Sequence, residues 1–296
     1  MPFVEKEPYK IKNNFAACVI LYNPTDDNIK NIDTYLSKVS ELYVYDNTET
    51  KSNENLFKEH TNIHYYWDGE NKGLSIRLNQ ACERALKSKF EYLLTMDQDS
   101  SFLEENIDQY FRNILSFPTK EEVAVYGLEY IINGISDITP NFSEVDHLIT
   151  SGSVLNLKIY NEIGGFDENL FIDVVDIDYC YSALTKGFKN IKFGKIFFEH
   201  SLGEPVKSGS IYSLYLIKKN KVVHSPLRIY YMCRNILYLE EKYTNKIPDN
   251  IKKLKQDYKH HIKKCIKYSD DFFKILRYKR RAIEDFNNKK MGKFQP

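Results

Sequence analysis

The first β-α unit of the chain decides the fold: the apolar run FAACVIL at 15–21 is followed by the polar turn YNPTD at 22–26. A short continuous apolar run bounded by turn residues is typical of a strand that is buried on both faces. The segment from Ile29 to Val39 then has apolar residues at helical spacing. We therefore predict a buried strand followed by a helix that packs on it.

Three further apolar runs, at 42–45, 63–67 and 92–96, continue this pattern, and an amphipathic helix is predicted at 74–86. Four strands alternating with helices imply a mostly parallel sheet covered on both faces. Ligands of such sheets bind outside the carboxyl ends of the strands. Asn, Asp and Gly also form turns, so a turn is an alternative at any one position. The polar residues at these ends are Tyr22, Asn23, Asp46, Asn47, Asp68, Asn71, Gly73, Asp97, Gln98 and Asp99.

The second half of the chain has a less regular pattern. Apolar spacing predicts helices at 102–116, 157–163 and 173–186, and a mainly helical segment from Ile211 onward. Strands are predicted at 123–127, 130–135, 145–149 and 191–198.

Charge is distributed unevenly along the chain. The formal net charge of +1 gives no electrostatic basis for binding nucleic acid. Residues 251–296 carry fifteen Lys/Arg and five Asp/Glu, so the rest of the chain is net acidic. We expect this basic tail either to contact an anionic membrane surface or to form a solvated helix packed on the main domain or on a partner subunit. Its apolar residues among the lysines are Tyr258, Ile262, Ile266, Phe272 and Phe273.

Cysteine usage and the N-terminus bear on the compartment. The five cysteines show no Cys-x-x-Cys pair and no zinc-ligand spacing, which predicts reduced, mostly buried thiols. The charged N-terminus argues against a secretory signal. The apolar segment at 15–22 is far shorter than the roughly 20 residues of a spanning helix. We expect a cytoplasmic protein, either soluble or peripheral at the inner face of the cell membrane.

Two carboxylates, Asp97 and Asp99, follow the predicted strand at 92–96. A hard divalent cation that bridges two phosphates needs oxygen ligands from the protein and open positions for phosphate and water. Carboxylates at a strand end meet that requirement. A calcium loop is excluded by spacing, because Phe102 replaces the required Gly and Asp108 replaces the required Glu.

A second acidic group, Asp173, Asp176 and Asp178, follows the sequence GGFDE at 164–168. The helix dipole favours acids at a helix start, so capping is the simpler interpretation. Three carboxylates exceed what capping needs, and one within reach of a hydroxyl would serve as a general base. On a helix, Asp173 would share a face with Asp176, and Asp178 would point away by about 200°.

In their order along the chain, these motifs resemble family 2 glycosyltransferases, which are inverting enzymes of the GT-A fold. The resemblance covers roughly residues 15 to 240. The strings MDQDS and FIDVVDIDYC are similar to those of bacterial rhamnosyltransferases that use dTDP-L-rhamnose for surface polysaccharides. The matching motifs are VILYNP at 19–24, DN at 46–47, NKG at 71–73, LTMDQDS at 94–100, TSG at 150–152 and GFDENLFIDVVDIDYC at 165–180.

The resemblance implies an α/β fold of the GT-A type, with a Rossmann-like, mostly parallel central sheet flanked by helices and a C-terminal helical extension. The catalytic domain would span residues 1–205. Its nucleotide-sugar half would occupy about 13–100 and its acceptor half about 101–205, and the basic helical extension would occupy 206–296.

The resemblance also implies roles for individual residues. The metal, Mn²⁺ or Mg²⁺, would be bound by Asp97, Asp99 and His200. Asp46 would contact the nucleobase. The residues that bind the nucleotide sugar would be Tyr22, Asn23, Asp46, Asn71, Gly73, Asp97 and Arg234.

Asp176 matches the catalytic base of the family, and Gly152 and Asp173 would contact the acceptor. The residue before this base is often Glu in the wider family and is Val175 here, which leaves a neighbouring role to Asp173 or Asp178. For His200, a structural histidine at a strand end is the alternative. For Arg234, helical packing among Tyr and Leu is the alternative.

The sequence thus predicts an inverting glycosyltransferase that transfers L-rhamnose from dTDP-L-rhamnose to a saccharide or lipid-linked saccharide acceptor in surface polysaccharide biosynthesis. A UDP-hexose donor is the nearest alternative. A sugar nucleotidyltransferase would need a glycine-rich phosphate loop, and 19–26 contains no glycine. A non-enzymatic metal-binding module would not need Asp176 or His200 near the metal. The oligomeric state, including a homo-oligomer, is left open.

Overall fold

A computed structural model of the chain describes residues 11–102, 106–131, 141–200, 206–209, 218–221, 224–269 and 271–296. The chain divides into two compact units. The first, called here the sheet unit, comprises the described residues of Met1–Asp167 and Tyr179–Ser201. The second, the helical unit, comprises those of Glu168–Asp178 and Leu202–Pro296.

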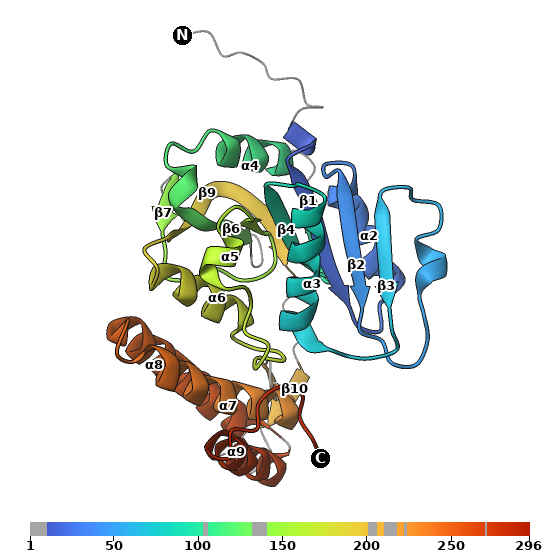
Figure 1. The fold of residues 1–296 in the computed structure, drawn as a ribbon. Helices are drawn as coiled ribbons and strands as arrows, with labels where there is room; N and C mark the ends of the chain where they lie inside the picture. The colour runs from blue at the N-terminus through green and yellow to red at the C-terminus, as the bar shows by residue number, and fades with distance from the viewer. Residues whose placement is uncertain are drawn as a thin grey trace. The chain divides into compact units, whose positions relative to one another are not determined.

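Four parallel strands form one side of the central sheet, in the order β3, β2, β1, β4 (Figure 1). The predicted strands are confirmed. The strand bounds are β1 Phe15–Leu21, β2 Glu41–Asp46, β3 Ile63–Trp67 and β4 Tyr92–Asp97. The chain moves outward from β1 to β3 and then crosses back to β4. Right-handed crossovers in opposite directions place their helices on opposite faces of the sheet.

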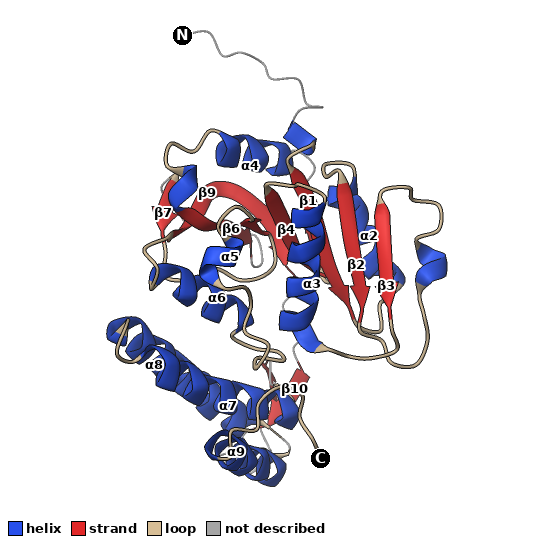
Figure 2. Ribbon diagram, in the orientation of Figure 1, coloured by secondary structure: helices blue, strands red, loops and turns tan. Residues whose placement is uncertain are grey.

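The helices α2 (Asp26–Leu36) and α3 (Gly73–Lys87) supply these covers, as the layers in Figure 2 show. One buried cluster joins alternate residues of β1, including Phe15 and Val19, to α2 and to α4 (Asn106–Leu115). α3 buries its own apolar stripe, which includes Leu78 and Cys82. Both faces of β1 are therefore apolar, which explains its continuous apolar run.

The other side of the sheet is mixed. β8 (Ser153–Asn156) runs antiparallel to both β4 and β6 (Val123–Ile131), and β6 pairs in parallel with β9 (Lys189–His200). The short strands β5 (Ser100–Phe102) and β7 (Phe142–Glu144) pair antiparallel with β9. The remaining short elements are α5 (Tyr160–Ile163) and the 3₁₀ turns Glu54–Leu56 and Lys120–Glu122.

The predicted strand at 145–149 is wrong, because this segment is a loop between β7 and β8. Its apolar residues are explained by packing: Leu148 is buried, and a Cβ on Gly127 would lie 2.5 Å from the Leu148 side chain. A few apolar residues in a short segment do not distinguish such a packed loop from a strand. The predicted strand at 130–135 coincides with the end of β6 up to Ile131, and its remainder lies outside the described residues.

Three helices dominate the helical unit: α7 (Pro226–Tyr243), α8 (Pro248–Tyr268) and α9 (Phe272–Asn287). Their apolar faces form a separate core that includes Tyr230, Cys233 and Cys265. The expectation of helix from Ile211 onward is wrong at Lys218–Lys221, which is the strand β11 and pairs with β10 (Val206–Gly209). Residues 211–217 lie outside the described residues.

The helix α6 (Val175–Leu184) begins later than the sequence predicted. Asp173 and Val174 have φ values of 67° and 57°, in the left-handed region, so neither continues a right-handed helix. Asp173 therefore precedes the helix. The prediction that it shares a helical face with Asp176 is wrong.

All five cysteines are buried and free, as predicted. Within the described residues, no helix combines the length and the apolar character needed to cross a bilayer.

Candidate active site

The polar carboxyl ends of the parallel strands converge, as the sequence predicted. After β1, the Asn23 N–H donates to Thr48 Oγ1 at 2.8 Å, which ties this end to the segment that follows β2. After β2, Asn47 Nδ2 donates to the Gly73 carbonyl at 3.1 Å, which ties it to the start of α3. These contacts make a continuous polar rim at one edge of the sheet.

The Asp97-Gln98-Asp99 turn belongs to this rim through its middle residue. Gln98 holds the backbone of Tyr22 from both sides: Oε1 accepts the Tyr22 N–H at 2.8 Å, and Nε2 donates to the Tyr22 carbonyl at 3.3 Å. The Gln98 carbonyl accepts two further bonds, at 3.0 Å each, from Asn28 and Asn31 of α2. The turn is therefore fixed by Gln98, to which the sequence analysis assigned no role.

The two carboxylates of this turn differ in exposure. Asp97 is half-buried at the end of β4, and its N–H donates to Ser151 Oγ at 3.4 Å. Asp99 is exposed. Asp99 thus lies at the surface of the turn, where a cation or a phosphate-bound metal can approach.

Asn71 and Gly73 form the turn that starts α3. The Gly73 N–H donates to Asn71 Oδ1 at 3.1 Å, and Gly73 has a φ of 77°, which a side chain would strain. The buried Arg77 supports this turn through Asn47, because its Nε donates to Asn47 Oδ1 at 2.8 Å.

Arg77 also makes a two-point contact with Asp68, at 2.7 and 3.1 Å. The hydrogen bonds from Arg77 hold the pKa of Asp68 well below its ordinary value. Asp68 is therefore charged at neutral pH and anchors the loop between β3 and α3. Arg77 is a charged residue on the apolar side of α3, and this position is the sequence signal for its buried role.

Asp46 is completely buried at the end of β2. Its Oδ1 accepts the Thr48 N–H at 2.8 Å, and its Oδ2 accepts bonds of 2.7 Å from Asn53 and from the Tyr65 hydroxyl. The observed partners make Asp46 an organiser of the loop after β2. Direct contact with a nucleobase would require Asn53 or Tyr65 to move away.

Gly152 lies in a tight loop beside the end of β4. Its N–H donates to the Thr95 carbonyl at 2.9 Å, its carbonyl accepts from the Tyr110 hydroxyl at 3.0 Å, and its φ is 73°. This geometry places the 150–153 loop next to Asp97, where the predicted acceptor half meets the strand ends.

The backbone of His200 also approaches this turn. β5 pairs antiparallel with β9, and in this register Ser100 lies opposite His200. The His200 backbone is thus opposite the residue that directly follows Asp99. The His200 side chain lies outside what the structure describes.

The second acidic group belongs to the helical unit. The Asp173 side chain is only 7% exposed, and its Oδ1 accepts bonds of 2.8 Å from both Nε and Nη2 of Arg228. Among the described residues, Asp173 Oδ2 is buried without a hydrogen-bond partner. Burial raises the pKa of Asp173 to about 6 against the opposing effect of Arg228. A buried carboxyl with a raised pKa and a spare oxygen is a candidate for proton transfer.

The left-handed backbone at Asp173 is held by Asn235 of α7. Asn235 Nδ2 donates to the carbonyls of Ile172 and Asp173, at 2.8 and 3.2 Å. Strained backbone that the surroundings hold in place is common at functional sites. Arg228 and Asn235 therefore shape this site, and neither role was predicted from the sequence.

Asp176 and Asp178 lie in the first turn of α6 but have different surroundings. Asp176 is half-buried, and its Oδ1 accepts the N–H of Ile177 at 2.9 Å. Asp178 is buried and pairs with Lys242 at 2.8 Å and with the Tyr243 hydroxyl at 2.9 Å. These contacts make Asp178 a structural residue of the helical unit.

Arg234 has internal partners for every guanidinium nitrogen. Nε donates to Asn235, Nη1 to the Tyr230 hydroxyl and the Lys290 carbonyl, and Nη2 to the Gly292 carbonyl at 2.7 Å. The side chain is 1% exposed and lies over the rings of Tyr230 and Tyr231. These contacts support the packing interpretation and fasten the C-terminal segment to α7.

The carboxylate oxygens of Asp97 and Asp99 at the sheet edge are ligands that suit a hard divalent cation. The described residues hold no group of three or more His, Cys, Asp or Glu side chains that could bind a metal by themselves. A cation at Asp97 and Asp99 would therefore take further oxygen ligands from a diphosphate and from water, as Mg²⁺ commonly does.

Known proteins similar to this chain are glycosyltransferases. The chain is 24% identical over 261 residues to the dTDP-rhamnosyl transferase RfbF of Shigella flexneri, covering 80% of the chain and 83% of that relative. It is 25% identical over 233 residues to the low-salt glycan biosynthesis hexosyltransferase Agl10 of Haloferax volcanii, covering 71% and 75%. No protein-family model matches the chain.

Among solved structures, the chain is similar to GalNAc-T7, crystallised with UDP, GalNAc and Mn²⁺, with a TM-score of 0.54 and 10% identity. The match covers 93% of the chain and 57% of the GalNAc-T7 chain. This likeness concerns the fold. Together with the sheet topology and the two relatives, it defines a glycosyltransferase of the GT-A fold. The predicted fold class is confirmed.

Proposed function

We propose that the chain is an inverting family 2 transferase that moves L-rhamnose from dTDP-L-rhamnose to a saccharide or lipid-linked saccharide acceptor of a surface polysaccharide. The observation that carries this proposal is the Asp97-Gln98-Asp99 turn at the carboxyl edge of the sheet, which Gln98 locks onto Tyr22. The similarity to a dTDP-rhamnosyl transferase over most of both chains supports the donor.

In this proposal the donor nucleotide lies along the polar rim. Tyr22, which is 48% exposed, and Asn23 contact the nucleoside, and Asp46 shapes the nucleobase pocket through Thr48 and Asn53. Asn71 and Gly73 line the pocket through their turn.

Asp97 and Asp99, with His200, bind Mn²⁺ or Mg²⁺ in the proposed enzyme. The bound metal would neutralise charge on the diphosphate leaving group. The rigid turn around Gln98 would keep both carboxylates in place, so that little reorganisation is needed when the donor binds. A role for Arg234 at the diphosphate stays a prediction, and its observed contacts support packing.

For catalysis we propose that Asp176 accepts the proton of the acceptor hydroxyl. Gly152 would contact the acceptor, and so would Asp173, whose Oδ2 is buried without a hydrogen-bond partner in the described part of the chain. Asp173 is the second candidate for the base, because its pKa of about 6 suits proton transfer near neutral pH.

A UDP-hexose donor is a second candidate. It is favoured by the similarity to a hexosyltransferase and by the fold neighbour crystallised with UDP and GalNAc. Incubation with a panel of nucleotide sugars, followed by product analysis, distinguishes the two. We expect transfer from dTDP-rhamnose, and dTDP should bind more tightly than GDP or ADP by calorimetry. Equal affinities for the three nucleotides would remove the basis for rhamnose.

We further propose that the basic tail contacts an anionic membrane surface, where lipid-linked acceptors reside. Its fifteen Lys/Arg against five Asp/Glu support this contact. Co-sedimentation with anionic vesicles that weakens as salt is raised is the expected result.

A further inference from the structure

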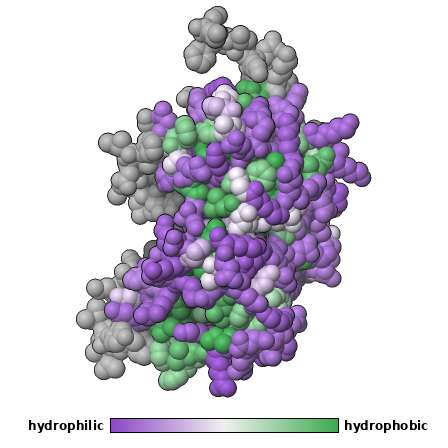
Figure 3. Space-filling view, turned by 60° about the vertical axis from the view of Figure 1, so that its left-hand side comes forward, coloured by the Kyte–Doolittle hydropathy of each residue, from purple (hydrophilic) through white to green (hydrophobic). Residues whose placement is uncertain are grey.

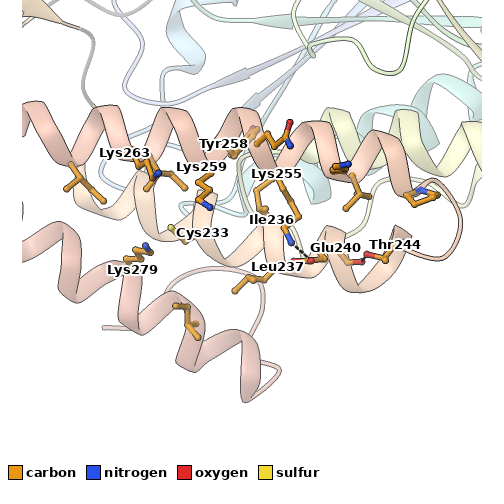
Figure 4. A pocket seen from close by; sticks show the side chains of 17 residues that line it. Cys233, Ile236, Leu237, Glu240, Thr244, Lys255, Tyr258, Lys259, Lys263 and Lys279 are labelled. Carbon is orange, nitrogen blue, oxygen red and sulfur yellow. Dashed lines mark hydrogen bonds and ion pairs between the residues drawn. The ribbon is translucent and has the colours of Figure 1, made fainter.

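A groove of about 560 Å³ lies between α7, α8 and α9 of the helical unit (Figure 4). It is called here the helical groove. Its volume lies within the range of roughly 300–1,000 Å³ that is common for small-ligand sites. The groove belongs wholly to the helical unit and has no role in the transfer reaction proposed above.

The floor of the helical groove is mainly aliphatic. Hydrophobic residues also gather on the surface in the lower part of Figure 3. A mainly aliphatic surface of this kind offers few hydrogen-bonding groups to a polar ligand, so a peptide backbone or a nucleotide would lose most of its water contacts there. The aliphatic lining residues include Ile236, Leu237, Ile251, Ile262, Ile266 and Ile283.

The edges of the helical groove are basic. Four of its lysines recur at helical spacing on α8, and a fifth comes from α9 (Figure 4). Glu240 is the single acid among the described lining residues, and it pairs with Lys255. The lining therefore keeps a clear positive excess. These lysines are Lys252, Lys255, Lys259, Lys263 and Lys279.

An exposed apolar stripe borders the groove on α9. Phe273 is 84% exposed, and Leu276 and Ile283 are 41% and 42% exposed. Positions three, seven and ten residues apart lie on one side of a helix, so these side chains form one stripe. Ile283 also lines the groove and joins the two apolar surfaces. Large exposed apolar residues beside lysines are typical of helices that lie at a membrane surface.

We propose that the helical groove holds one hydrocarbon chain of an anionic membrane phospholipid, with the lipid phosphate bound by the lysines at its edge. The aliphatic floor suits a chain that has no polar groups, and the positive edge complements the phosphate. This inference rests on the membrane contact proposed for the basic tail and does not depend on which sugar is transferred.

The chain offers a matched pair of charge reversals to test the edge. Lys252 and Lys263 line the groove, and their neighbours Lys253 and Lys264 on the same helix do not. Each neighbour is turned by about 100° around the helix axis. The variants Lys252→Glu/Lys263→Glu and Lys253→Glu/Lys264→Glu therefore change the net charge equally.

Co-sedimentation of the full chain with phosphatidylcholine vesicles, with and without phosphatidylglycerol, is the first measurement. Binding should require phosphatidylglycerol. Because each lysine near an anionic surface contributes about 1 kcal/mol, Lys252→Glu/Lys263→Glu should weaken binding by about 30-fold or more, and the control pair should weaken it far less. Equal losses would overturn the groove while leaving a membrane contact through overall charge.

Soluble alkyl phosphates, kept below their micelle concentrations, test the floor with the unmodified chain. Calorimetry should show affinity rising by about fourfold for each added methylene, because each buried CH₂ contributes about 0.8 kcal/mol. Leu237→Trp, which fills the groove, should remove this dependence on chain length. Affinity equal to that of inorganic phosphate would overturn the proposal. If alkyl phosphates bind but vesicles do not, the ligand of the groove does not come from a membrane. If an acidic peptide binds more tightly, the groove belongs to a protein partner.

Discussion

The two acidic groups of this protein use the same residue type in opposite surroundings. Asp97 and Asp99 lie in a turn at the edge of the sheet unit, and Asp99 is exposed. In the helical unit, the side chains of Asp173 and Asp178 are 7% and 2% exposed and pair with Arg228 and Lys242. A cation from solvent can reach a carboxylate at an exposed turn, whereas a carboxylate that is buried with a basic partner is already neutralised by that partner.

This difference separates the members of the second group from one another. Asp178 has a lysine and a tyrosine as partners. Asp173 has an arginine on one oxygen, and its second oxygen is buried without a hydrogen-bond partner among the residues that the structure describes. Asp176 remains at the start of α6 with a local backbone contact. Burial and pairing therefore suggest different roles for three acids that lie within six residues of one another in the sequence.

Replacing Asp176 tests the second group most strongly. Asp176→Asn keeps the shape but cannot accept the proton of the acceptor, so kcat should fall by roughly 10²–10⁴ while donor affinity stays near normal. Steady-state kinetics with the acceptor, together with calorimetry of dTDP binding, measure the two quantities. A wild-type rate, or a loss of dTDP binding in proportion to activity, would move the role of base to Asp173.

Replacing Asp99 tests the exposed group. Asp99→Asn removes both a charge and a ligand, so metal-dependent nucleotide binding should weaken by more than about 100-fold, since even outer-shell changes at metal sites cost 10–100-fold. Calorimetry of dTDP binding with and without Mn²⁺ measures this effect. Undiminished turnover of the wild-type enzyme in excess chelator would contradict a metal at this site.

Asp173 should make the stability of the protein depend on pH. Its pKa is about 6 in the folded state against an ordinary value of 3.8. The folded state therefore holds a proton that the unfolded chain has already released. The resulting stability is fully present below about pH 4 and is lost as pH rises through about 6, by up to about 3 kcal/mol.

Asp173→Asn stays neutral at all pH values and should remove this dependence. Urea unfolding of both proteins between about pH 4 and pH 7 measures the difference. Parallel stability curves for the two proteins would show that Asp173 has an ordinary pKa.

Replacing Asp178 should affect stability and leave chemistry intact. Asp178→Asn removes the charge that faces Lys242, whose side chain is 27% exposed. Because Lys242 can then turn to water, the free energy of unfolding should fall by only about 2 kcal/mol. Thermal unfolding and kcat of the folded variant are the measurements. A loss of kcat as large as that of Asp176→Asn would place Asp178 in the catalytic group.

The sequence alone determined those elements of the sheet unit in which apolar residues form a continuous run or recur at helical spacing. β1 to β4, with α2 and α3, follow from apolar runs and helical spacing, because strands buried on both faces and amphipathic helices leave a local pattern. The same reasoning placed the polar strand ends at one edge, since parallel strands share the direction of their carboxyl ends.

Tertiary structure decided what depends on contacts between segments far apart in the chain. The 145–149 segment contains apolar residues that suggested a strand, yet it is a loop that packs Leu148 against Gly127. Asp173 lies outside its predicted helix because Asn235 holds its backbone from α7. Gln98 fixes the turn through Tyr22, and Arg234 fastens the C-terminal segment through the carbonyls of Lys290 and Gly292. Periodicity records which side of an element is apolar, but the partner of a polar side chain is set by the packing of distant segments.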